Sequence, residues 1–278
     1  MINTPSMLMV KSKTIPTLIF ILLCCQTLFQ KWVIKPNIIY IKGNVRVLES
    51  GVEKLAEYES LTTPLRIITG ESSFSVVSIS FGQEEVCKIT IYPDSGLEVS
   101  RSEKIPQGVL RVFLSDLSGT VILAAKNCEF NLGNLKILNG TVRLRHTPNK
   151  KIAEVLNGLA YFNKIELKTG WGIDSSSVKP YILNSEPEIV LPKEGKIINP
   201  FYLLWKRNEK SRKYFVEISI SKDFENILFF TETEENKFFP SEITMKIMSD
   251  VYYWRVWYID EEQKGSLFSK TESFKIKK

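Results

Sequence analysis

The sequence is poor in the residues that most often carry chemistry, with one histidine and four cysteines among 278 residues. His146 is the only imidazole available as a base for a nucleophile, and we expect it in an exposed turn at a strand end. The cysteines lack metal-ligand spacing, and one histidine does not complete a zinc site with them. No Gly-x-Ser-x-Gly, phosphate loop or strand–glycine loop–helix unit occurs. We therefore expect neither an enzyme nor a cofactor or metal site, although a glycosidase pair of distant carboxylates stays open.

The charge of the chain is also modest, with 37 basic and 31 acidic residues and a net charge of +6. A nucleic-acid-binding protein usually concentrates positive charge on one stripe, whereas here the two signs alternate along the chain. The densest basic stretch is residues 206–213. We interpret it as a solvated loop between strands, with a surface for anionic lipid or acidic glycan as the alternative. No nucleic-acid partner is expected.

The N-terminus has the pattern of a membrane-targeting segment. Lys11 and Lys13 precede an apolar run over residues 15–29, which corresponds to a charged region followed by a hydrophobic region. The run is short for a membrane span, which needs about 20 residues. We expect residues 1–36 to be a signal peptide or a membrane anchor with a helical apolar part; a buried core helix is the remaining alternative.

Three kinds of targeting segment fit this pattern. The first is a cleaved export signal, and the second is a lipoprotein signal acylated at Cys24 or Cys25. The third is an uncleaved anchor bounded by Lys31 and Lys35. Basic residues before the run place the short N-terminus in the cytoplasm and the remainder outside it. The expected location is therefore the periplasm or cell envelope, as an inner-membrane-anchored protein or a lipoprotein.

Residues 37–180 show the pattern of an all-β domain. Residues 76–81 and 88–92 alternate apolar and polar side chains with a period of two, as half-buried strands do. The second run stops at a turn of the type Pro-Asp-Ser-Gly over residues 93–96. Further apolar runs follow at hairpin spacing, so the region is predicted to consist of short antiparallel strands.

The order of motifs in this region resembles the FecR domain of bacterial envelope proteins. The shared features are glycine-bearing strand pairs, a Thr-Gly-x-x-Ser stretch before a strand, and a proline–serine stop after the next strand. They fall at residues 41–48, 67–73, 76–81, 89–95, 138–141, 157–161 and 168–172. The chain departs from the family at residues 83–85, where an aspartate–glycine turn is usual.

The two remaining cysteines, Cys87 and Cys128, fall inside this region. They are either free core residues or a disulfide, since export would permit the bond but the sequence does not give the distance between them.

Residues 181–278 are predicted to form a second β module, a β-sandwich. Strict alternation over residues 214–221 and a long aromatic strand over residues 252–260 indicate several short strands. The segment is similar to fibronectin type III-like or other Ig-like domains, and the Tyr-x-Trp-Arg-Val motif at residues 252–256 is the most specific part of that similarity.

Alternation along this aromatic strand separates its side chains into two faces. Trp254 and Val256 point one way and Trp257 the other, so we expect Trp205 and Trp254 in the core. Tyr253 and Trp257 are expected to form an exposed aromatic binding patch.

Together these features predict an all-β, non-enzymatic envelope protein that binds or organises partners. The expected partners are the membrane, through the N-terminal segment, and an envelope protein or cell-wall glycan. The FecR resemblance also implies envelope signalling to a sigma factor as an alternative. The expected cytoplasmic part is very short, residues 1–13, so we expect a scaffold rather than iron signalling. Peptidoglycan or glycan binding is the other alternative.

Overall fold

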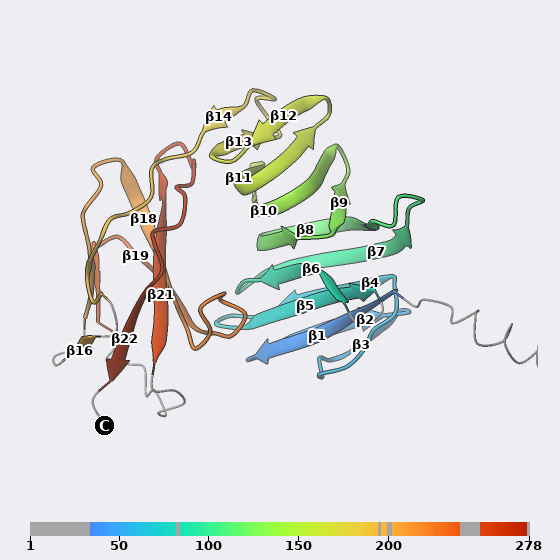
Figure 1. Cartoon of the computed structure of the whole chain (residues 1–278), viewed down its shortest axis with the longest axis horizontal. Helices are drawn as coiled ribbons and strands as arrows, with labels where there is room; N and C mark the ends of the chain where they lie inside the picture. The colour runs from blue at the N-terminus through green and yellow to red at the C-terminus, as the bar shows by residue number, and fades with distance from the viewer. Residues whose placement is uncertain (1–33, 82–83, 194–195, 199–201, 240–250, 277–278) are drawn as a thin grey trace, which may run out of the picture. The chain divides into compact units, whose positions relative to one another are not determined.

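The computed structural model describes residues 34–81, 84–193, 196–198, 202–239 and 251–276. All regular elements in these ranges are β-strands, so the all-β prediction is confirmed for this part of the chain (Figure 1). The expected N-terminal helix, with Cys24 and Cys25, lies outside the described residues.

None of the described residues belongs to a helix with the length and hydropathy needed to cross a membrane.

The first strand begins inside the range expected for the targeting segment. β1 (Ile34–Lys42) pairs with β5 (Phe74–Phe81), and Lys35 lies opposite Ser80. Pro36 and Ile38 are both buried on one face of β1, which explains why these residues join the sheet. The expected boundary at residue 36 is therefore corrected to residue 33, and Lys35 belongs to the β module.

Residues 34–182 form a 14-stranded, mostly antiparallel sheet. Besides β1 and β5, its strands are β2 (Val45–Glu49), β3 (Val52–Leu55), β4 (Leu65–Thr69), β6 (Glu84–Ile91), β7 (Gly96–Lys104), β8 (Leu110–Ala125), β9 (Cys128–Leu132), β10 (Leu135–Thr147), β11 (Lys150–Phe162), β12 (Ile165–Lys168), β13 (Trp171–Asp174) and β14 (Tyr181–Ile182). The last strand, β14, falls just beyond the boundary expected at residue 180.

The sheet is folded into two layers, because three long strands pass from one layer to the other. The first half of β8 pairs with β7 and β9, and its second half pairs with β6 and β10. Likewise β11 pairs with β13 before Gly158 and with β12 after it. Apolar side chains from both layers form one continuous core between them.

Facing glycines make the bends in β10 and β11. Gly140 and Gly158 lie opposite each other in the register, with φ of 88° and 92°. A Cβ atom on either glycine would collide with the backbone of the other strand, at the carbonyl of Asn157 or of Asn139. Both positions therefore need glycine, for the left-handed backbone and for the close approach.

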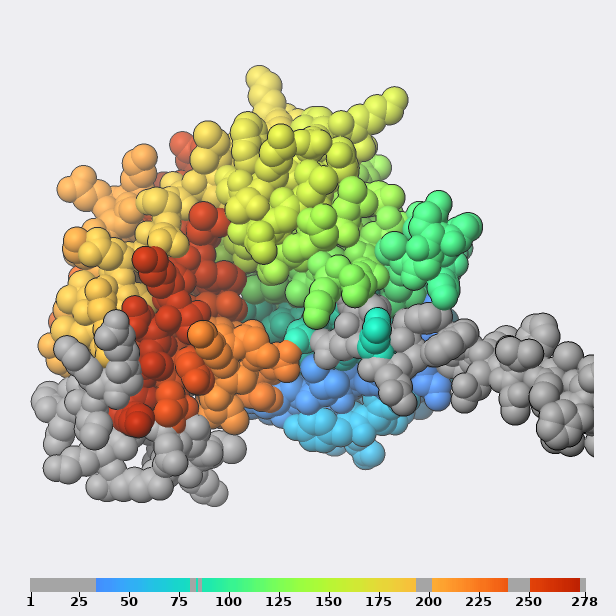
Figure 2. Space-filling model, viewed as in Figure 1, coloured from blue at the N-terminus to red at the C-terminus, as the bar shows by residue number. Residues whose placement is uncertain are grey.

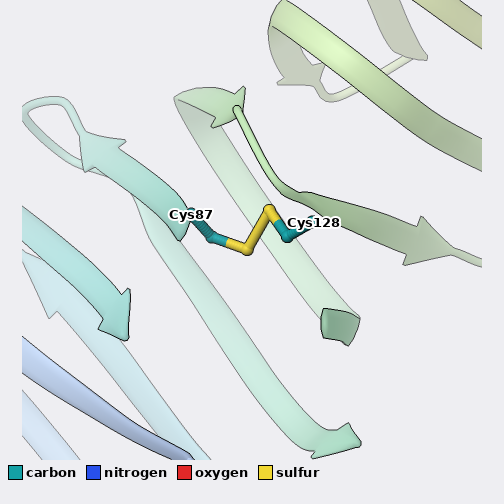
Figure 3. Close-up of a disulfide and its surroundings, with 2 residues drawn as sticks. All are labelled: Cys87 and Cys128. Atoms are coloured by element: carbon teal, nitrogen blue, oxygen red, sulfur yellow. A yellow bond between two sulfur atoms is a disulfide. The ribbon is translucent and has the colours of Figure 1, made fainter. Parts of the chain in front are cut away.

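A disulfide links the two layers of the folded sheet. Cys87 in β6 is bonded to Cys128 at the start of β9, and their Cα atoms are 5.9 Å apart (Figure 3). Both residues are 1% exposed and belong to the common core. Of the two alternatives left open by the sequence, the structure has the disulfide.

The remaining strands form two smaller sheets that pack face to face in a sandwich-like arrangement. One sheet contains β15 (Ile189–Leu191), β17 (Leu203–Trp205) and β20 (Lys237–Phe238). The other contains β16 (Lys196–Ile198), β22 (Glu272–Ile276), β21 (Tyr252–Asp260), β18 (Ser211–Ser219) and β19 (Ile227–Thr233). Trp205 and Trp254 are fully buried between these sheets, as predicted.

The basic stretch at residues 206–213 divides between a loop and a strand. Lys206, Arg207 and Lys210 are exposed in the loop between β17 and β18, as expected, while Arg212 and Lys213 open β18. Lys206 and Lys213 form ion pairs with Glu188 and Glu232, both 2.6 Å long.

Candidate functional site

The expected exposed aromatic patch does not hold in the structure. Trp257 is 1% exposed, and its ring stacks on Phe215 at a centroid distance of 3.9 Å. Tyr253 is half-buried and packs against an aromatic cluster that includes Phe74 and Tyr92 of the 14-stranded sheet. Alternation along β21 gives the direction of its side chains correctly, but the second face of this strand is covered by the larger sheet and not by water.

We call the contact between the five-stranded sheet and the 14-stranded sheet the junction; Tyr253 and Trp257 lie in it on one side, and Phe74, Tyr92 and Arg143 on the other. One of its centres is Glu217 of β18, whose carboxylate is fully buried. The carboxylate accepts hydrogen bonds from Arg255 Nε at 2.7 Å, the Tyr92 hydroxyl at 2.9 Å and Trp257 Nε1 at 3.1 Å. Burial, followed by the negative charge of Glu217, raises the pKa of Tyr92 well above 10.0. The hydroxyl therefore stays a hydrogen-bond donor between the two sheets.

A second buried ionic centre lies on the β10–β11 hairpin. Arg143 Nε and Arg145 Nη2 donate to the Glu154 carboxylate at 2.6 and 2.7 Å. Burial alone would raise the pKa of the Glu154 carboxyl, but the two guanidinium groups outweigh burial and lower that pKa from 4.5 to about 2. Glu154 is therefore a carboxylate at neutral pH, held between two cations.

The backbone of the β21–β22 connection completes this centre. The carbonyls of Ser266 and Gln263 accept hydrogen bonds from Arg143 and Arg145 at 2.7 and 2.5 Å. The amide of Gly265 donates to Glu154 at 2.7 Å. A Cβ atom on Gly265 would collide with the Arg143 and Glu154 side chains, so glycine is needed for this approach.

Aromatic rings cover the charged groups of the junction. The guanidinium of Arg143 lies 3.9 Å from the ring centroid of Trp257, and that of Arg255 lies 3.7 Å from Phe268. At the other end of the junction, the Tyr40 hydroxyl donates to the carbonyl of Ile227 at 2.8 Å. In Figure 2 the orange residues of the β19 region lie directly against the blue residues of the first strands.

The sequence carries a signal for this junction. Apart from Arg255 and Asp260, β21 has apolar or aromatic side chains on both faces, which is typical of a strand buried on both sides. The β10–β11 hairpin likewise places Arg143, Arg145 and Glu154 at positions flanked by buried apolar residues. Charged residues at such positions indicate a covered face with paired charges.

An open cavity of the 14-stranded sheet has a volume of about 420 Å³ and lies between the two layers. Its walls are apolar, with Leu135 and Phe162 from one layer and Leu144, Ala153 and Ile173 from the other. The β9–β10 turn and the start of β11 border it at opposite ends of the hairpin, whereas the Gly140 and Gly158 bends lie mid-strand between these two borders. Both halves of the bent hairpin therefore contribute to the walls, and the cavity opens between them.

Lys151 lines this opening, and His146 lies opposite it in the β10–β11 register. Residues opposite each other in an antiparallel pair share a face, so His146 and Lys151 point to the same side as the cavity residues Leu144 and Ala153. His146 is half-buried within β10, not in an exposed turn as expected, and its Nδ1 lies 2.5 Å from the carbonyl oxygen of Leu117. Lys151 is exposed, and no ion pair within the described ranges includes it. Asp116, the other charged residue lining the cavity, is paired with Arg66.

Within the described residues, no cluster of three or more histidine, cysteine, aspartate or glutamate side chains is arranged to hold a metal ion. No protein-family model matches the chain, and no curated protein is significantly similar to it in sequence.

Proposed function

We propose that the protein is a non-enzymatic scaffold or binding protein of the bacterial cell envelope. It is exported, attaches to or passes the inner membrane through its N-terminal segment, and presents a FecR-like β module and a fibronectin type III-like module to an envelope partner. The family assignments rest on the motif order of residues 41–172 and on the Tyr-x-Trp-Arg-Val motif.

The observation that carries this proposal is the junction. Its two central carboxylates, Glu154 and Glu217, are fully buried and accept hydrogen bonds from arginine, tyrosine and tryptophan donors of the protein itself. These groups have structural partners and are closed to a substrate. Residues 34–278 accordingly cluster as one compact unit, as a scaffold that holds two modules together requires.

The Cys87–Cys128 disulfide supports export. Disulfides persist in oxidising compartments such as the periplasm and are rare in the reducing cytosol. Cleavage of a signal before Ile34 would leave every described strand intact, since β1 begins there.

The decisive experiment is to fractionate the native host and determine the intact mass and N-terminus of the protein. A diacyl or triacyl mass on a Cys24 or Cys25 start supports a lipoprotein, and an intact Met1 start in the membrane supports an anchor. An unlipidated periplasmic start just before Ile34 supports a soluble exported scaffold. A cytosolic protein with reduced Cys87 and Cys128 would refute the proposal.

Partner capture tests the scaffold role separately. Cross-linking in intact cells should recover a defined envelope protein. Sedimentation with purified peptidoglycan at high salt would instead favour glycan recognition, and this would involve other residues than Trp257, which is buried in the junction.

A further inference from the structure

The cavity between the two sheet layers has the chemistry of a binding site for an apolar chain. Leucine, isoleucine, alanine and phenylalanine side chains dominate its walls, and the polar lining residues include Ser115, Asn134 and Ser175. Small-molecule sites in proteins commonly have volumes of about 300–1,000 Å³, apolar walls and a few polar groups. The volume of about 420 Å³ falls in this range.

The opening of the cavity leaves apolar side chains accessible. Leu132 of β9 and Phe162 at the end of β11 line the cavity, pack against the core and are only half-buried. Apolar groups of the opposite wall, such as Leu144 and Ile173, are 1% exposed. The apolar lining thus continues from an accessible entrance into the core, as a narrow apolar ligand requires.

The charge at the entrance favours an anionic head group. Asp116 is neutralised by Arg66, whereas Lys151 has no ion-pair partner in the described part of the chain. His146, opposite Lys151 in the register, adds a second nitrogen-bearing side chain on the same side. A ligand with one negative charge at the end of an apolar chain would place that charge beside Lys151 and its chain between the layers.

We propose that this cavity binds a free long-chain fatty acid, with the carboxylate beside Lys151 and the acyl chain between the two layers. The cavity volume of about 420 Å³ is at the lower end of the range for small-molecule sites and suits a single-chain ligand. One chain fits this volume and two do not, which favours a fatty acid over a two-chain phospholipid. The site has this chemistry whether or not the protein also serves as a scaffold.

Titration of the full-length protein with cis-parinaric acid, a fluorescent fatty acid, tests the proposal. We expect saturable binding of one molecule per chain. Ala153→Phe fills the cavity from β11 and should weaken binding more than about tenfold. Ala124→Phe is the matched control, because Ala124 alternates with the core residues Leu123 and Ala125 and points away from the cavity; it should bind like wild type.

Two charge-reversal variants test whether the carboxylate binds beside Lys151. Lys151→Glu should weaken binding of the fatty acid about tenfold while leaving binding of its uncharged methyl ester unchanged. Lys126→Glu makes the same charge change in the β8–β9 turn, away from the cavity lining, and should have no effect on either ligand.

Thermal melts establish that each variant is folded, and Leu132→Gln at the half-buried entrance replaces Ala153→Phe if the latter does not fold. Equal binding by wild type and all cavity variants would overturn the proposal, because the probe would then bind elsewhere, such as the apolar N-terminal segment. No saturable binding by folded wild type would also overturn it, as would binding to phosphatidylglycerol vesicles without binding of the free fatty acid.

Discussion

The two faces of the β10–β11 hairpin differ in what covers them. One face carries Arg143, Arg145 and Glu154, which are buried in the junction although all three are charged. The opposite face carries Leu144 and Ala153 and ends at an open cavity with Lys151 at its entrance. Whether a side chain of this hairpin is buried therefore depends on the element that packs on its face, and the polarity of the side chain alone does not predict its burial. The charged face is closed and the apolar face is partly open.

The largest expected loss of stability comes from removing a buried cation from the charged face. Arg143→Ala removes one of two cations from the buried Glu154 and the cation over Trp257, so it should lower the free energy of unfolding by about 3–5 kcal/mol. Chemical denaturation followed by Trp fluorescence measures this loss. A change below about 1 kcal/mol would mean that the junction does not exclude water.

Removal of the disulfide tests how much this bond between the two layers stabilises the folded protein. A double Cys87→Ala, Cys128→Ala variant should lose about 2–4 kcal/mol, because the bond closes a loop with a sequence separation of 41. The same denaturation experiment, with wild type under reducing and non-reducing conditions, provides the check. Equal stability of the double variant and of non-reduced wild type would contradict a disulfide that constrains the unfolded chain.

Acid should affect the charged face selectively. The pKa of Glu154 is lower in the folded protein, about 2, than the ordinary 4.5, so the unfolded chain binds more protons as the pH falls below 4.5. The stabilisation is fully present above about pH 4.5 and is lost as the pH falls toward about 2. The difference in unfolding free energy between wild type and Glu154→Gln should therefore shrink over this range. A difference that stays constant would show that folding does not lower the pKa of this carboxyl.

The smallest effect is expected at an ion pair outside both faces. Arg46 and Glu53 form a 2.6 Å pair on β2 and β3, with side chains about half exposed at 49% and 48%. Arg46→Ala should change the free energy of unfolding by less than about 1 kcal/mol, because solvent screens such pairs. A larger loss, measured beside Arg143→Ala, would mean that exposure does not separate the two kinds of ion pair.

Local patterns in the sequence predicted the strands and the sandwich core. The alternation around Trp254 identifies its inward face correctly because side-chain direction in a strand has a period of two. The same alternation could not identify what covers Trp257, because Arg143, whose guanidinium lies over the Trp257 ring, is more than 100 positions away in the sequence. Local periodicity therefore predicts which way a side chain points, whereas the element that packs on it is set by the tertiary structure.

The disulfide and the cavity depend on long-range geometry in the same way. Cys87 and Cys128 come within bonding distance because β8 passes between the layers and pairs with the strands that carry both cysteines. The cavity exists because β10 and β11 bend at Gly140 and Gly158, and glycine in a sequence does not reveal whether it serves a turn or a mid-strand bend. The N-terminal segment stays a prediction, as do the family resemblances.

The facing glycines of β10 and β11 also have an evolutionary consequence. Because Gly140 and Gly158 each contact the backbone of the other strand, substitution of either one alone meets a collision that the other cannot relieve. Divergent relatives should therefore keep both or replace the whole hairpin, so the two positions are expected to co-vary. A glycine pair spaced 18 residues apart across an apolar hairpin is then a search pattern for distant homologues of this sheet.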